Sequence, residues 1–201
     1  MINFPAWDTD LFLFLNGLNS PFIDELMRPW ITDMYIFVPF FAFALYLFYK
    51  QLGWQVFLFA IIGIALCILL ADRISSGFFK PFFERCRPSH NPALEGLVHT
   101  VGGKLGGRYG FVSSHAANVF AVGFYAMLLL RRKWFSITML SVALIISYSR
   151  VYVGVHYPLD VICGGLFGAI CGTTVYYLHR WVVQKWLAPK YKIRQNTVCR
   201  K

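Results

Sequence analysis

Charged residues are scarce in this chain, and acidic residues are the scarcest. Only 14% of the 201 residues are charged, nine are Asp or Glu, and 58% are hydrophobic. A water-soluble core of ordinary proportions cannot hold so much apolar surface, so this balance favours an integral membrane protein. The formal net charge of +10 could indicate nucleic-acid binding. The placement of the cations argues against it, and no nucleic-acid partner is expected.

The cysteines are too few and too scattered to form a disulfide framework or a zinc site. The five cysteines are odd in number, and neither a disulfide pattern nor a zinc-ligand spacing is present. A basic segment before the first apolar stretch is also lacking, because Asp8 and Asp10 precede residues 11–15. No cleavable signal peptide is therefore expected. A nucleotide phosphate loop is excluded because Gly103-Lys104 is not followed by Ser or Thr.

Long apolar runs are present, and they predict an all-α, polytopic membrane bundle. Five runs have the length and low charge of transmembrane helices: residues 34–49, 53–71, 116–130, 134–148 and 158–178. No internal repeat or linker divides the chain, so one domain is predicted. Its parts are an amphipathic N-terminal region at residues 1–32, the bundle at 34–180 and a basic cytoplasmic tail at 181–201.

The N-terminal region is too polar for an ordinary span. We expect two short amphipathic helices in the outer membrane interface, separated near Asn19. Ser20 can cap the second helix and Pro21 can begin it. The alternative is a sixth span that tilts and buries its charges inside the bundle.

The cations predict the orientation. All nine acidic residues lie between Asp8 and Asp160, on segments assigned to one side of the membrane. The opposite side collects eleven cations and no acid: Lys50, Arg131, Arg132, Lys133, Arg180, Lys185, Lys190, Lys192, Arg194, Arg200 and Lys201. Because cytoplasmic loops are rich in Lys and Arg, this second side is predicted to be cytoplasmic.

One polar cluster lies between the last two apolar runs. Pro158 suits the first position of a helix, so His156 should precede that helix and Asp160 should lie in its first turn. There the carboxylate can accept a hydrogen bond from one imidazole nitrogen and leave the other as a nucleophile. Gly154 permits a turn that brings Arg150 back to bind an oxyanion. The alternative is a helix-capping carboxylate beside an interfacial histidine and a snorkelling arginine.

Two further clusters fall on the same predicted outer side. Lys80 and Arg87 belong to an outer segment, residues 73–114, that is longer than a connection requires. Basic residues decorate many helix ends, so this pair alone is a weak signal.

The other cluster immediately precedes the third span. Ser113, Ser114 and His115 place hydroxyl groups and backbone N–H groups at a helix N-terminus, which is a favourable anion site. Ordinary serine capping beside an interfacial histidine is the alternative.

Together the clusters resemble the motifs of the type 2 phosphatidic acid phosphatases, membrane enzymes related in their site to vanadium haloperoxidases and acid phosphatases. The family pattern is Lys, six residues, Arg-Pro; then Pro-Ser-Gly-His; then Ser-Arg, five residues, His, three residues, Asp. The matching residues are Lys80, Arg87-Pro88, Ser113-Ser114-His115, Ser149-Arg150, His156 and Asp160. The middle motif departs twice, with Val112 for proline and Ser114 for glycine.

The resemblance implies a role for each matched residue. His156 would attack phosphorus and form a phosphohistidine, and Asp160 would hold its tautomer. His115 would protonate the leaving group and then activate water. The phosphate oxygens would be bound by Lys80, Arg87, Arg150, Ser113 and the Ser114 N–H. Three fixed cations make a metal unnecessary, so neither a metal nor another cofactor is expected.

The function expected from this resemblance is a membrane lipid phosphatase, a hydrolase acting on a lipid phosphate monoester or diphosphate. Undecaprenyl diphosphate, phosphatidylglycerophosphate, phosphatidic acid and lipid A all fit as substrates, and the sequence does not rank them. Transfer to a second hydroxyl, or lipid-phosphate binding or transport without catalysis, are the alternatives. The expected place is a bacterial inner membrane, with the site on the periplasmic face and the C-terminus in the cytoplasm. The partners are the bilayer and the lipid phosphate, and no oligomeric state is indicated.

Overall fold

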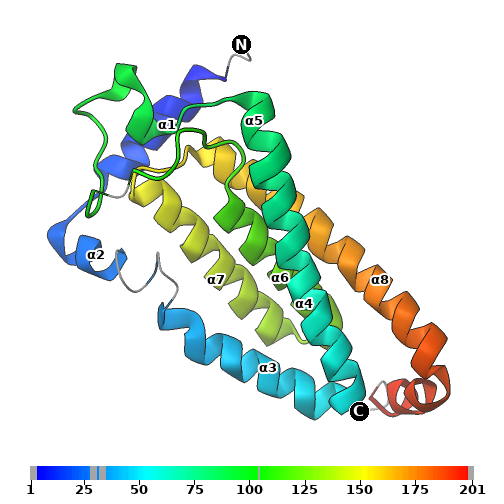
Figure 1. Cartoon of the computed structure of the whole chain (residues 1–201). Helices are drawn as coiled ribbons and strands as arrows, with labels where there is room; N and C mark the ends of the chain where they lie inside the picture. The colour runs from blue at the N-terminus through cyan, green and yellow to red at the C-terminus, as the bar shows by residue number, and fades with distance from the viewer. Residues whose placement is uncertain (1–3, 28–30, 32–34, 104, 199–201) are drawn as a thin grey trace.

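The chain folds into long helices packed side by side (Figure 1). The computed structural model describes residues 4–27, 31, 35–103 and 105–198, and no strand is present within these ranges. The main helices are α3 (Val38–Leu52), α4 (Trp54–Ile74), α6 (Ser114–Leu130), α7 (Lys133–Tyr152) and α8 (Pro158–Val198). The predicted all-α bundle is therefore confirmed.

Each apolar run of the sequence corresponds to one of these helices. Three described segments are long and apolar enough to cross a membrane: Trp54–Phe83, Lys133–Tyr152 and Pro158–Trp186. The shorter apolar helices α3 and α6 belong to the same bundle (Figure 1). Many of the large apolar side chains on these helices are exposed, as expected where a bundle faces lipid instead of water.

The helix that begins with α4 is longer than the sequence predicts. The outer segment was expected to start at residue 73, directly after the charged residue Asp72, but the helical path continues through a π-helical stretch (η3, Ser75–Phe79) and α5 (Lys80–Phe83). The reason is the run of phenylalanines beyond Asp72, since Phe78 and Phe82 point outward and extend the apolar face. Lys80 therefore lies on a helix and not on a loop.

Two short helices form the N-terminal region. They are α1 (Ala6–Gly17) and α2 (Pro21–Leu26), and the Ile23 N–H donates to the Ser20 hydroxyl at 3.4 Å in the expected cap. α1 contacts α7 and α8, and Asp8 is fully buried against the bundle. Part of this predicted region, residues 1–3, 28–30 and 32, lies outside the described residues.

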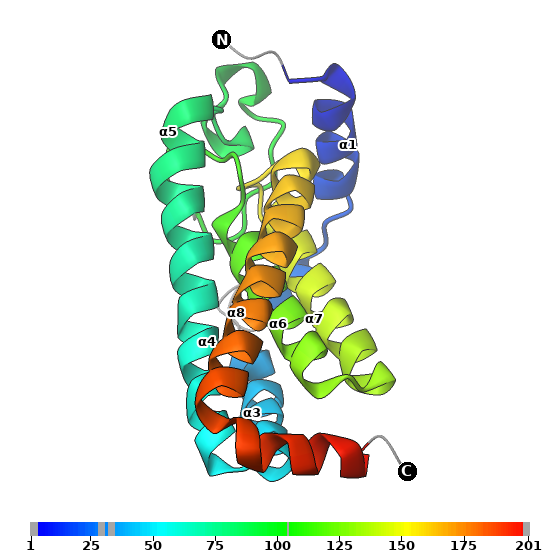
Figure 2. The ribbon, with the colours of Figure 1, turned by 90° about the vertical axis from the view of Figure 1, so that its right-hand side faces the viewer.

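The two ends of the bundle differ in chemistry. The N-terminal helix α1 and the loop between α5 and α6 lie at one end, and the connections α3–α4 and α6–α7 lie at the other (Figures 1 and 2). The second end carries Lys50 and Arg131–Lys133, as the charge pattern predicts. Residues 181–198, predicted as the start of a tail, continue α8, and its last part runs across the bundle axis (Figure 2).

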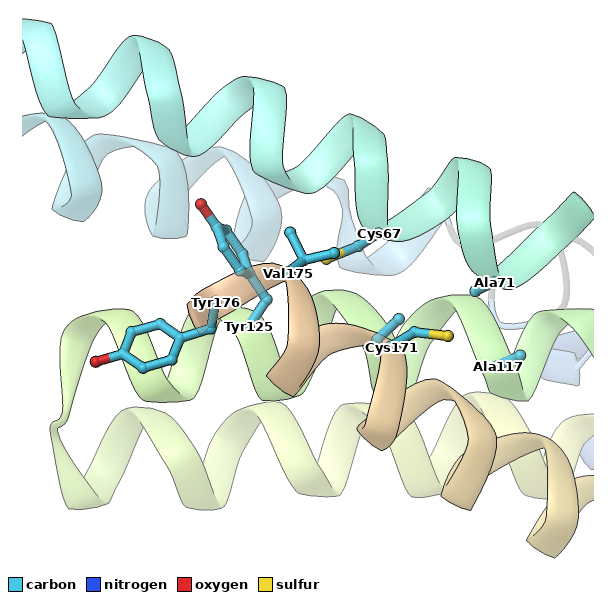
Figure 3. Packing of buried hydrophobic residues seen from close by; sticks show 8 residues of the cluster. Cys67, Ala71, Ala117, Tyr125, Cys171, Val175 and Tyr176 are labelled. Atoms are coloured by element: carbon cyan, nitrogen blue, oxygen red, sulfur yellow. The ribbon is translucent and has the colours of Figure 1, made fainter. Parts of the chain in front are cut away.

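Close packing of α6 on α8 forms the centre of the bundle. Small side chains such as Ala71, Ala117 and Cys171 lie between α4, α6 and α8 (Figure 3). A side chain added at Gly168 or Gly172 of α8 would strike the backbone of α6 at Ala117 or Ala121. Small residues let two membrane helices approach this closely. The approach matters for the site, because α6 and α8 both begin there.

Replacing Gly168 with valine should therefore destabilise the protein. Overpacking of a filled interface costs about 1–3 kcal/mol, so we expect a clear fall in the melting temperature in detergent. Ile170→Val is the matched control, because Ile170 lies on the same helix with its side chain 65% exposed. Equal melting temperatures for the two variants would contradict the close approach of α6 and α8.

Candidate active site

The turn between α7 and α8 places the candidate nucleophile. Gly154 has a φ of 79°, a conformation that favours glycine, and an added Cβ would lie 2.7 Å from the His99 carbonyl oxygen. The N–H groups of Val155 and His156 both donate to the Arg150 carbonyl at 3.2 Å. The chain thus reverses directly after Arg150, as the sequence predicts, and delivers His156 to the start of α8.

His156 and Asp160 form a buried pair. The His156 Nδ1 atom lies 3.4 Å from Asp160 Oδ2, which also accepts a hydrogen bond from the Tyr157 N–H at 3.1 Å. Burial lowers the pKa of His156 to about 4, so the ring is neutral at neutral pH. A carboxylate facing Nδ1 favours the tautomer in which Nδ1 carries the proton, which leaves a lone pair on Nε2.

Lys80 is held by serine hydroxyl groups. Its Nζ donates to Ser114 Oγ at 2.8 Å and to Ser76 Oγ at 3.4 Å. Ser75 donates to the same Ser114 oxygen at 2.9 Å. Ser114 was expected to act through its backbone N–H in place of a glycine, and its φ is not positive, so a serine fits there without strain. Its side chain has the additional role of directing the lysine.

Ser113 joins the α6 and α8 parts of the site. Its hydroxyl caps α6 by accepting from the Ala116 N–H at 3.5 Å, and its own N–H donates to the Asp160 carbonyl at 3.0 Å. The first turns of α6 and α8 are therefore linked by a direct backbone hydrogen bond. The motif on α6 and the motif on α8 meet through this contact.

Two arginines flank the pair. Arg87 donates through Nε to the Tyr109 carbonyl at 3.2 Å and through Nη1 to the Val155 carbonyl at 3.4 Å. This second contact ties the guanidinium to the residue directly before His156. Arg150 is buried in the last turn of α7. Both guanidinium groups therefore belong to the end of the bundle that holds His156.

His115 is the solvent-facing member of the site. It is the second residue of α6, and its side chain is exposed whereas those of Ser113, Ser114 and Ala116 are buried. It lies within electrostatic range of four site residues, namely Arg150, His156, Lys80 and Arg87. The structure thus brings all the predicted site residues together at one end of the bundle.

Sequence reasoning missed several residues of this site. Ser75 and Ser76 bind the Ser114 hydroxyl from a helix that was expected to have ended. Arg85 carries no signal in the sequence beyond its place near the first motif, yet it contacts Asp160 and Asp8 directly. A buried acid in an amphipathic segment has no local signature, so only the tertiary structure identifies Asp8.

The arrangement suits reaction at a phosphate group. Lys80, Arg87 and Arg150 supply positive charge, the start of α6 supplies N–H groups, and a neutral imidazole stands beside them. Within the described part of the chain, no three His, Cys, Asp or Glu side chains gather as metal ligands. Oriented cations and N–H groups stabilise the charge that develops during phosphoryl transfer.

Comparisons with known proteins identify the family of this chain. The PAP2 superfamily matches residues 58–184. The chain is 40% identical over 173 residues to a lipid A 4′-phosphatase of Bacteroides thetaiotaomicron, covering 85% of this chain and 76% of that protein. A lipid A 4′-phosphatase of Porphyromonas gingivalis is 37% identical over 180 residues, covering 90% and 76%.

Solved structures share the fold. LpxE of Aquifex aeolicus aligns with a TM-score of 0.61 at 24% identity, covering 86% of this chain and 96% of that one. A PAP2-type phosphatidylglycerolphosphate phosphatase of Bacillus subtilis aligns with a TM-score of 0.62 at 21% identity, covering 90% and 86%. The family match confirms the resemblance that the motifs predicted. The chain belongs to the PAP2 superfamily and is a membrane phosphatase.

Proposed function

We propose that this enzyme hydrolyses a phosphate monoester on a lipid headgroup. We further propose that its substrate is lipid A, from which it removes the 4′-phosphate. The observation that carries the reaction is the neutral, buried His156 held by Asp160 beside three cations at one end of a membrane bundle. The choice of lipid A as the substrate rests on the two lipid A 4′-phosphatases that are similar to most of this chain.

In the first step, the lone pair on His156 Nε2 attacks phosphorus. The N–P bond forms as the bond from phosphorus to the ester oxygen breaks, and the departing oxygen takes a proton from His115. Burial and the neighbouring cations lower the pKa of His115 to about 3 before the substrate binds, and the negative charge of the bound phosphate favours the protonated ring that this step requires. The His156 ring becomes positive in this step. Asp160, which faces Nδ1, stabilises that charge.

In the second step, a water molecule attacks the phosphohistidine. His115, now neutral, accepts a proton from the water as its oxygen bonds to phosphorus. The N–P bond breaks, its electron pair returns to Nε2, and inorganic phosphate leaves. The exposed position of His115 on α6 supports this role, because the ring can meet both the leaving oxygen and incoming water.

The cations of the site stabilise the phosphate throughout. Lys80 is already oriented by Ser114 and Arg87 by two backbone carbonyls, so little reorganisation is needed when an anion binds. The same charges perform the electrostatic part of metal catalysis. We therefore expect full turnover in EDTA.

The test is phosphate release by the purified enzyme in detergent with EDTA. The panel comprises lipid A, undecaprenyl diphosphate, phosphatidylglycerophosphate and phosphatidic acid, and mass spectrometry shows which phosphate lipid A has lost. We expect loss of the 4′-phosphate without an added acceptor. Release from another lipid alone would overturn the substrate, and turnover that requires an acceptor would indicate transfer. Loss of turnover in EDTA that magnesium restores would overturn the metal-independent mechanism.

Membrane orientation is a separate prediction. The site is proposed to face the periplasm of a bacterial inner membrane, with the basic end of the bundle in the cytoplasm. Gly107→Cys and Arg132→Cys mark the two ends, since both residues are exposed. In an active cysteine-free variant in intact spheroplasts, a membrane-impermeant thiol reagent should label position 107 and spare position 132. Labelling of position 132 alone would mean that the orientation is reversed.

A further inference from the structure

One arginine links the N-terminal helix to the proposed nucleophile. Arg85 donates through Nη2 to Asp8 Oδ2 at 2.6 Å and through Nη1 to Asp160 Oδ1 at 2.7 Å. Both carboxylates are fully buried, and the arginine side chain is 7% exposed. Asp8 belongs to α1, Arg85 follows α5 and Asp160 belongs to α8. Three distant segments thus meet at this guanidinium.

Aromatic rings fix the plane of the guanidinium. Its central carbon lies 4.0 Å from the ring centre of Phe4 and 3.9 Å from that of Tyr157. Stacking of this kind favours Arg over Lys, because the planar group packs on a ring while its N–H groups remain available in the plane. The rings and the two carboxylates leave Arg85 a single orientation.

The remaining carboxylate oxygens are used as well. Asp8 Oδ1 accepts from the Leu159 N–H at 2.9 Å, at the start of α8. Asp160 Oδ2 accepts from the Tyr157 N–H and faces His156 Nδ1. An unbroken chain of contacts therefore runs from Asp8 through Arg85 and Asp160 to His156.

In this chain of contacts, Arg85 supplies the positive charge that both carboxylates face. Two buried carboxylates share a single guanidinium, and loss of one partner of a buried ion pair leaves an uncompensated buried charge. Without Arg85 on Oδ1, the Asp160 carboxylate would lose the contact that fixes its orientation toward His156 Nδ1. Loss of Arg85 would thus act on the nucleophile without touching the phosphate.

We infer that Asp8 and Arg85 are positioning residues, which hold the Asp160 carboxylate in its orientation toward Nδ1 so that Nε2 of His156 stays free to react. α1 is accordingly part of the active site and not only an interfacial anchor. The inference rests on the proposed role of His156 as the nucleophile. It assigns a function to an N-terminal acid that lies outside the part of the chain matched by the PAP2 superfamily.

The experiment compares Asp8→Asn, Arg85→Lys and Arg85→Gln, with Asp10→Asn as the matched control. Asp10 lies on the same helix but is exposed. Groups that orient a reacting residue contribute about 10–100-fold, judged from the partners of metal ligands. We expect kcat to fall by about this factor in Asp8→Asn and further in Arg85→Gln, with KM little changed. Arg85→Lys should retain more activity than Arg85→Gln, and Asp10→Asn should match the wild type.

The double variant Asp8→Asn/Arg85→Gln gives the sharper result. Removing the second carboxylate relieves the unpaired charge that Arg85→Gln creates, so the double variant should be at least as active as Arg85→Gln alone. Independent roles for Asp8 and Arg85 predict that the two losses multiply. Multiplied losses, or wild-type kinetics in Asp8→Asn, would overturn the inference. Asp8→Asn keeps the shape of the side chain and is expected to fold, so it tests the inference even where Arg85→Gln unfolds.

A single-turnover measurement separates this inference from the proposed function. If labelled phosphate never appears on His156 in the wild type, the proposed nucleophile is wrong whatever the variants do. If His156 is phosphorylated in the wild type and equally fast in Asp8→Asn and Arg85→Gln, only the positioning role is wrong. The inference expects slower formation of the phosphohistidine in both variants.

Discussion

Replacing His156 with alanine is expected to abolish phosphate release while lipid-phosphate binding persists. The change removes the Nε2 lone pair but leaves the cations and the α6 N-terminus in place. Loss of a nucleophile costs on the order of 10⁴-fold or more in kcat in enzymes that form covalent intermediates. Binding is checked by equilibrium titration of the variant with the lipid, and turnover by release of inorganic phosphate.

His90→Ala is the control for this variant. His90 lies in the loop between α5 and α6 and contacts the hydroxyl of its neighbour Ser89 at 3.2 Å, so its loss should leave turnover near the wild-type rate. Turnover of His156→Ala within about tenfold of the wild type would remove His156 as the nucleophile, because a covalent mechanism does not tolerate that loss.

A single methyl group added at Gly110 is expected to lower kcat by about 100-fold. An added Cβ would lie 2.9 Å from Asp160 Oδ2, 3.2 Å from Arg87 Cγ and 3.5 Å from His156 Nδ1. It would therefore press on the carboxylate beside the imidazole. Misplacement of reacting groups by about 1 Å costs about 10²-fold in rate. The measurement is kcat for phosphate release by Gly110→Ala.

Gly107→Ala is the matched control for this change. It adds the same methyl group three residues earlier in the loop, where nothing lies within 4 Å of the added atom. We expect wild-type kcat and an unchanged melting temperature for this variant. Wild-type kcat in Gly110→Ala would contradict the close contact of this loop with the His156–Asp160 pair.

Local signals explain what the sequence could predict. Apolar runs predict the helices, because backbone groups in a membrane must be satisfied within each segment. Pro158 predicts the start of α8, and the four-residue spacing of His156 and Asp160 predicts their contact at the first turn. Such features depend on neighbours along the chain, so they are visible without a structure.

Contacts between distant segments explain what the sequence could not predict. Arg85 and Asp8 are 77 residues apart, and Lys80 and Ser114 are 34 apart. No spacing rule connects such pairs, because their meeting depends on how α1, α5, α6 and α8 pack. The continuation of α4 beyond Asp72 was missed for a different reason. A charged pair near a helix end usually marks the membrane boundary, whereas here the phenylalanines extend the helix.

The measurement that tests the central claim most directly is a rapid acid-free quench of the wild-type enzyme mixed with a lipid phosphate labelled at phosphorus. Mass spectrometry of the digested protein then locates the label. The account predicts an acid-labile phosphate on His156 that forms before inorganic phosphate is released. Label on another residue, or rapid turnover with no labelled protein at any time, would contradict the phosphohistidine mechanism.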